Sequence, residues 1–180
     1  MTTIKPALST MKLALMAAMA VAGAGVASSS QAAQATATAS GTVVAPIAIV
    51  AATNLAFGTF APGAGGNVTV STSGVRSSTG PVLLGAGASS AARFNITGQA
   101  GLTYSITHAG STQLSNGSSF MTLTKFSDLT GVNGSSGNVS SGMLDGAGTQ
   151  SLFVGGTLAV GANQLAGLYS GSIVATVEYN

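Results

Sequence analysis

The stretch from Gly171 to Asn180 is the strongest constraint that this sequence places on its own fold. Apolar and polar side chains alternate along it with a period of two residues. That period is typical of a β-strand that buries one of its faces. The predicted buried face carries Ile173, Ala175, Val177 and Tyr179. A strand of this kind needs a sheet and a core, so the chain is constrained to a fold with β-structure.

Similar short apolar runs, separated by turn-forming residues, continue through the rest of the chain. They predict a single all-β domain of the sandwich or barrel type. The candidate strands are 42–50, 55–60, 67–71, 81–84, 92–97, 102–108, 119–124, 150–154, 157–160 and 171–179. Gly155 and Gly156 predict the tight turn of a hairpin over 151–160. The Gly- and Ser-rich stretch 131–148 is predicted to be a mobile loop, and the small residues of 85–92 are also predicted to form a loop.

The opening residues have the order of a secretory signal peptide. Lys5 and Lys12 precede an uncharged apolar run over 13–26, which small residues follow. This order predicts a signal peptide over 1–35, cleaved after Ala33-Gln34-Ala35, with Ser30-Gln31-Ala32 as an alternative site. The apolar run is too short to span a membrane, because a span needs about 20 residues. We therefore expect export through the periplasm to the cell surface or beyond, with no membrane insertion of the mature chain.

Removal of the signal peptide changes the charge balance. The net charge of +2 includes Lys5 and Lys12. The remaining charges are Arg76, Arg93, Lys125, Asp128, Asp145 and Glu178. Three cations against three anions leave no basic cluster for nucleic acid or anionic lipid. A surface with so few charges is poorly protected against association, which suits a protein that works in an assembly.

No enzyme site is evident. His108 is the one histidine in the chain, and no Gly-x-Ser-x-Gly motif accompanies it. We expect His108 to lie in a solvent-facing turn. The scattered carboxylates do not cluster as metal ligands do, and the chain has no cysteine with which to form a disulfide. We expect no catalysis, no cofactor and no metal.

Gly167 and Tyr179 stand at the positions of a known C-terminal signature, with the aromatic residue second from the end of this sequence. The pattern resembles that of bacterial pilins assembled by the chaperone–usher route. The resemblance implies an Ig-like, pilin-like β-sandwich whose last strand is an edge for subunit assembly, at Gly167, Ile173, Ala175, Val177 and Tyr179. It also implies a periplasmic chaperone and an outer-membrane usher as partners. Many such pilins carry a disulfide, and this chain departs from them in having no cysteine.

A second resemblance covers almost the whole mature chain. Its motifs are Pro46-Ile47, Leu55-Ala56-Phe57-Gly58, Val154-Gly155-Gly156-Thr157-Leu158 and Gly167-Leu168-Tyr169-Ser170-Gly171 through Tyr179. This order resembles a family of secreted bacterial, pilin-related domains of unknown function. Members often have Asp where this chain has Ala56. The resemblance implies the fold and export, and no chemistry.

The residues after the predicted cleavage site also alternate. Ala37, Ala39, Gly41, Val43 and Ala45 share one face over 36–45. This segment is either a donor strand for a neighbouring subunit or the first strand of its own domain (36–180), because both need the same alternation. Pro46 favours a break at that point.

The expected function is therefore a structural subunit of a bacterial surface filament, or pilus-like fibre (fimbrium), assembled by β-strand addition. The alternative is a self-contained secreted β-sandwich domain acting as a matrix or cell-adhesion protein.

Overall fold

The computed structural model describes residues 31–85 and 87–180. Residues 42–180 form one compact unit. Residues 31–41, taken by themselves, are exposed and carry no helix or strand. The predicted signal peptide lies outside the described residues except for 31–35, so its cleavage stays a prediction.

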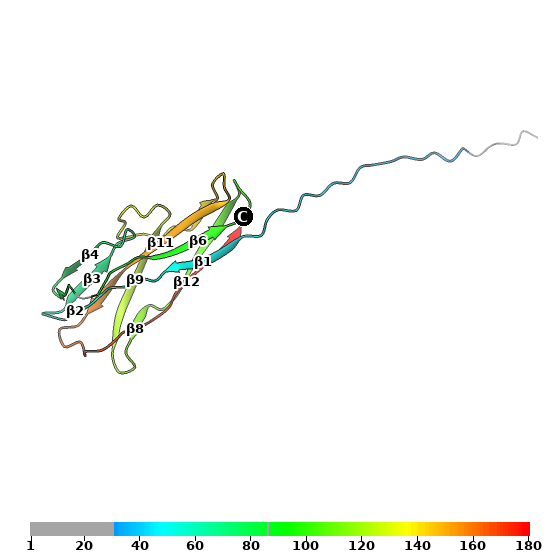
Figure 1. Ribbon diagram of the computed structural model, residues 1–180. Helices are drawn as coiled ribbons and strands as arrows, with labels where there is room; N and C mark the ends of the chain where they lie inside the picture. The colour runs from blue at the N-terminus through cyan, green and yellow to red at the C-terminus, as the bar shows by residue number, and fades with distance from the viewer. Residues whose placement is uncertain (1–30, 86) are drawn as a thin grey trace, which may run out of the picture. The chain divides into compact units, whose positions relative to one another are not determined.

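Every regular element in the described part of the compact unit is a β-strand (Figure 1). The strands are β1 (Ala48–Thr53), β2 (Phe60–Ala61), β3 (Gly66–Val70), β4 (Arg76–Thr79), β5 (Val82–Leu83), β6 (Ala92–Thr97), β7 (Thr103–Gly110), β8 (Gln113–Ser115), β9 (Phe120–Asp128), β10 (Ser141–Met143), β11 (Thr149–Val160) and β12 (Ile173–Tyr179). All their pairings are antiparallel. No helix among the described residues is long and apolar enough to cross a membrane.

Strand β11 organises the seven-stranded sheet. Its first half pairs with β6 and its second half with β3, while β9 pairs with the middle of its opposite edge. The sheet continues from β6 to β1, from β3 to β4 and from β9 to β8. One long strand thus pairs with three neighbours, and the antiparallel sheet includes a curled half-barrel. A three-stranded sheet has the order β10-β7-β12, and β2 pairs with β5.

The core has two clusters along β11. The first joins β6 and β11 to β7 and β12, and its largest fully buried members include Ile96, Tyr104 and Leu152. The second lies between β3, β9 and the end of β11, and includes Val68, Leu123 and Leu158. Tyr104 is fully buried, its hydroxyl has no hydrogen-bond partner among the described residues, and burial raises its pKa.

The all-β, single-domain prediction is confirmed, and the predicted hairpin over 151–160 is wrong. Gly155 and Gly156 lie inside β11, and neither has a positive φ. A Cβ at Gly155 would collide with the Phe126 ring, and one at Gly156 would lie 2.9 Å from Leu123. These glycines therefore let β9 and its side chains approach β11 closely. The missing Cβ makes room for a neighbouring strand and does not serve a turn.

The predicted loop over 131–148 is partly wrong, because it contains β10 and the fully buried Leu144. The predicted strand over 42–50 begins only at Ala48. The stretch 55–60 contributes a single bridge, between Ala56 and Ser90, before β2 begins.

Candidate functional site

Two strand edges face each other in the compact unit without pairing. Within the described residues, β1 pairs with β6 alone and β12 with β7 alone. The two strands nevertheless lie side by side (Figure 1). They run in opposite directions, because Ala45, just before β1, contacts Tyr179 at the end of β12, whereas Thr53 lies near Ile173. We call this junction the β1–β12 seam.

The alternation predicted for the last strand is present in β12. Ile173, Ala175 and Tyr179 are half-buried on the inner face, and Val177 is 9% exposed. Val174, Thr176 and Glu178 are exposed on the outer face. The inner residues pack against the first core cluster. The predicted edge residues of β12 therefore combine a partly buried face with an unpaired backbone edge.

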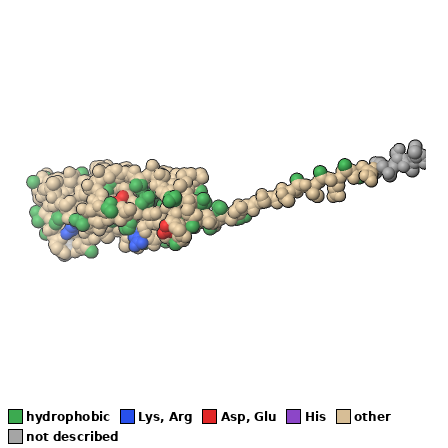
Figure 2. All heavy atoms as spheres, turned by 90° about the horizontal axis from the view of Figure 1, so that it is seen from above, with side chains coloured by type: hydrophobic (Ala, Val, Ile, Leu, Met, Phe, Trp, Pro, Cys, Tyr) green, Lys and Arg blue, Asp and Glu red, His purple; other side chains and the backbone are tan. Residues whose placement is uncertain are grey.

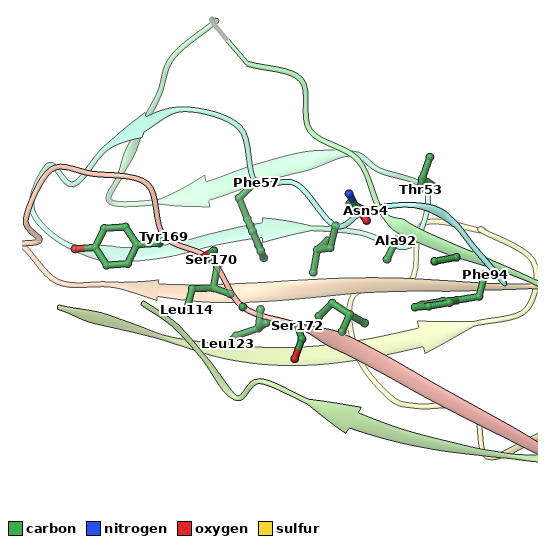
Figure 3. A pocket seen from close by; sticks show the side chains of 14 residues that line it. Thr53, Asn54, Phe57, Ala92, Phe94, Leu114, Leu123, Tyr169, Ser170 and Ser172 are labelled. Atoms are coloured by element: carbon green, nitrogen blue, oxygen red, sulfur yellow. The ribbon is translucent and has the colours of Figure 1, made fainter. Parts of the chain in front are cut away.

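The seam opens at the Thr53–Ile173 end into a groove of about 450 Å³. Figure 3 shows Phe57 reaching from one wall toward Leu114 and Leu123 on the other. Ala51 also lines this groove. It pairs with the buried Phe94, so its side chain shares the core face of β1, yet it is exposed. The inner face of β1 is thus uncovered at this end.

The hollow continues into a second groove of about 820 Å³, which shares Leu55, Phe57, Leu114 and Tyr169 with the first. Residues 55–62 form one wall, and residues 164–169 form the other. Its floor includes Met121, Leu158 and Val160, all members of the second core cluster. The two hollows together, which we call the open groove, lie directly over core side chains, and Met121, Leu158 and Val160 beneath them are at most 5% exposed.

The Leu55-Ala56-Phe57-Gly58 motif forms part of the first wall, and Arg76 holds it in place. The guanidinium donates hydrogen bonds to the carbonyl oxygens of Phe57 (2.9 Å), Thr59 (3.2 Å) and Leu84 (3.0 Å). Gly58 has φ +67°, and a Cβ there would collide with this guanidinium. The glycine of the motif therefore allows the arginine to bind the wall.

The opposite wall contains the predicted site residue Gly167, which has φ +152°. Gln164 fastens this wall by donating hydrogen bonds to Ser119 Oγ (2.7 Å) and to the Tyr169 hydroxyl (2.7 Å). Ser170 and Ser115 exchange two backbone hydrogen bonds at 2.9 Å. Gly167 thus belongs to the groove wall, whereas the other predicted edge residues lie on β12.

The far end of the seam is closed by Tyr179. Its hydroxyl donates a hydrogen bond to the carbonyl oxygen of Ala45 (2.9 Å) and accepts one from the amide of Gln99 (2.6 Å). A Cβ at Gly98 would collide with this hydroxyl. The aromatic residue of the C-terminal signature therefore ties the segment before β1 to the end of β12.

The predicted donor residues show no strand pairing. Ala37, Ala39, Gly41, Val43 and Ala45 are exposed and lie outside every strand. The segment 36–45 thus consists of residues 36–41, which lie outside the compact unit, and 42–45, which lead into it.

His108 does not lie in a solvent-facing turn, so that prediction is wrong. It is half-buried on β7, with Nε2 2.8 Å from the Val139 carbonyl oxygen and 3.1 Å from Ser127 Oγ. A carbonyl oxygen only accepts, so Nε2 must carry a proton. It therefore cannot take the hydroxyl proton of Ser127 in this arrangement.

The carboxylates of Asp128 and Asp145 serve local structure. Burial raises the pKa of Asp128, but hydrogen bonds from Thr72 and from the amides of Thr130 and Gly131 outweigh it, so the pKa lies below its ordinary value. The pKa of Asp145 is also lowered, by the amide and hydroxyl of Thr149. Within the described residues, no three metal-binding side chains come together.

The sequence does not reveal several of the groove residues. Ala51 lies just beyond the strand predicted over 42–50, and Arg76 shows only a charge between turn-forming residues. Leu114 lies in a strand too short to show alternation. Its sequence neighbours are polar. A single apolar residue among polar ones does not predict which part of the fold its side chain contacts.

Comparison with known proteins identifies a family without assigning a function. Residues 47–179 match the model of the family described as Domain of unknown function (DUF4402). Because the match covers most of the chain, the protein belongs to this family. Membership in a family of domains of unknown function is expected from the sequence. No curated protein and no solved structure matches the chain.

Proposed function

We propose that this protein is a structural subunit of a bacterial surface filament, and that its subunits are joined by β-strand addition. The observation that carries the proposal is the open groove at one end of the β1–β12 seam, where two unpaired strand edges meet a hollow that lies directly over core side chains. In this proposal the domain is an Ig-like, pilin-like β-sandwich that lacks the strand between β1 and β12.

An unpaired edge normally carries features that discourage pairing with another chain, such as Lys, Pro or a bulge. Strand β1 contains no charge and no proline, and the only charge on β12 is Glu178 on the outer face. The one irregularity is a register shift between Ala51 and Thr53. Two nearly unprotected edges at one seam therefore support the addition of a strand from outside.

The donor in this proposal is segment 36–45 of a second copy. An extended chain rises about 3.3 Å per residue, so this segment is long enough to follow the whole of β12. Its small inward side chains at Ala37, Ala39 and Gly41 would lie over the core. Its outward threonines would remain in water.

The surface composition agrees with assembly. Charged side chains are sparse on the face shown in Figure 2. A surface with so few charges offers little electrostatic repulsion between copies. A periplasmic chaperone and an outer-membrane usher are the proposed partners in transit, and the proposal assigns the protein no enzymatic activity, cofactor or nucleic acid.

A charge placed in the groove tests the proposal. Ala51 and Val50 are both exposed on β1, but only Ala51 lies on the core face. Ala51→Asp and Val50→Asp should leave the stability of the single subunit within about 0.5 kcal/mol of wild type. Ala51→Asp should abolish the ladder of assembled subunits on unheated gels, because strand addition would bury its carboxylate. Val50→Asp should keep the ladder.

Equal ladders from both variants would contradict a groove that accepts a strand. Wild-type protein that stays monomeric at high concentration, even with a candidate chaperone, would favour the alternative of a self-contained secreted matrix or adhesion domain. The Tyr179–Ala45 hydrogen bond is the observation that favours this alternative, because it closes one end of the seam within a single chain.

A further inference from the structure

Ala45 lies within the compact unit, just before β1, at the closed end of the seam. Ala45 is bonded to Tyr179, and β1 begins three residues later at Ala48. Residues 36–44 are therefore joined through Ala45 to one end of the seam at which the proposed function places a donor strand. Residues 36–44 of the same chain and those of a second copy would therefore compete for the position between β1 and β12.

A tethered segment has a large advantage in such a competition. Short flexible connections give effective concentrations in the millimolar range, about a thousandfold above a micromolar protein solution. A subunit that can fill its own groove would therefore remain a monomer. Assembly into chains requires a feature that blocks self-insertion.

The geometry of the seam shows what self-insertion would require. Strands β1 and β12 run in opposite directions. To lie between them, residues 36–44 would have to reverse direction just before β1 and form a hairpin with it. The inserted strand would then be antiparallel to β1 and parallel to β12.

The residues at the point of reversal oppose the two-residue loop that is commonest in hairpins. Two-residue hairpin loops need a positive φ at the first central residue, which Asn or Gly supplies. Pro46 is fixed at a negative φ, and Ala45 has a Cβ that disfavours a positive one. The Ala45 carbonyl is already bound by the Tyr179 hydroxyl, which is in turn bound by the Gln99 amide.

We propose that Ala45, Pro46 and the Tyr179 hydroxyl form a stop that keeps residues 36–44 out of the groove of their own chain, so that the segment is available to a second copy. This inference rests on the proposed function. It assigns Tyr179 and Pro46 as positioning residues that direct assembly between copies.

Replacing the stop with a turn tests the inference in the full mature chain. The triple variant Ala45→Asn, Pro46→Gly, Tyr179→Phe supplies an Asn-Gly turn and removes the hydroxyl. The variant should shift from ladders to monomers whose fraction does not change over a hundredfold dilution. Amides of residues 36–44 should become protected from hydrogen exchange in this monomer, which a merely destabilised subunit would not show.

A matched control places the same residue pair in an exposed loop away from the groove, as Ser135→Asn with Ser136→Gly. The control should form ladders like the wild type. If the wild type forms ladders and the triple variant forms the same ladders, the proposed stop is overturned and the proposed function is not. Monomers of the triple variant with unprotected residues 36–44 would also overturn the stop. Wild-type protein that forms no ladder would overturn the proposed function and the stop together.

Discussion

Arg76 illustrates how one side chain can determine the shape of the groove. It is half-buried, and it binds three backbone carbonyls from two segments that carry no regular strand pairing at those points. Hydrogen bonds from a charged donor are roughly twice as strong as neutral ones. The first wall of the groove therefore depends on a residue far from it in sequence.

Gly58 is the residue that makes this contact possible, and its substitution gives a residue-scale prediction. Gly58→Ala should destabilise the protein by about 2–4 kcal/mol, because a positive φ costs Ala about 1–2 kcal/mol and the new Cβ would crowd Arg76 and the Gly87 carbonyl. Gly101→Ala is the control, since Gly101 has φ +76° and no heavy atom lies within 4 Å of the place that its Cβ would take. Urea unfolding should show a smaller loss for Gly101→Ala, and equal losses would contradict the contact.

Asp128 gives a prediction on pH dependence. Its carboxylate accepts hydrogen bonds from Thr72 and from the amides of Thr130 (2.8 Å) and Gly131. Burial raises its pKa, but the hydrogen bonds together lower it by more, so the folded pKa lies below the unfolded one. The charged form therefore stabilises the fold above about pH 4, and this contribution is lost as the pH falls through the folded pKa.

Asp128→Asn should cost about 1–3 kcal/mol of unfolding free energy at pH 7, because charge-assisted hydrogen bonds are replaced by weaker ones. The difference from wild type should shrink as the pH falls from about 4 through the lower pKa of the folded protein, because over that range the unfolded chain takes up a proton at Asp128 and the native carboxylate does not. Unfolding free energies measured from pH 7 to pH 2 check this. A difference that stays constant over that range would mean that the charge of Asp128 makes no contribution.

At the scale of elements, the alternation of long strands is predictable from sequence and the use of glycine is not. The patterns of β6, β7 and β12 each mark a strand with one buried face, and the structure contains all three. Gly155 and Gly156 suggest a turn because both a turn and a close strand approach need a missing Cβ. Only the φ angle separates these two uses, and sequence does not contain it.

The short strands β4, β8 and β10 escape prediction for a related reason. Three or four residues cannot display a period of two clearly enough to stand out from a loop. The candidate site shows the same limit. The inner face of β12 is predictable residue by residue, whereas the walls at Arg76 and Leu114 come from segments that only the tertiary fold brings to β12.

At the scale of the whole molecule, the proposed function gives each subunit one donor segment and one groove. Such a head-to-tail contact does not pair a surface with itself, so it generates open chains wherever successive contacts do not close into a ring. A chain of this kind grows only while each new subunit can both accept and donate.

A subunit without its donor should therefore terminate chains. Deleting residues 36–41 removes only residues outside the compact unit, so the groove stays intact. When one subunit in ten carries the deletion, chains should average about ten copies or fewer, because each addition has that chance of being the last. The same deletion combined with Ala51→Asp should have no effect on chain length, since such a subunit can neither donate nor accept. Gel ladders of mixed samples measure both. Chains of undiminished length in the presence of the deleted subunit would show that segment 36–41 does not join one copy to the next.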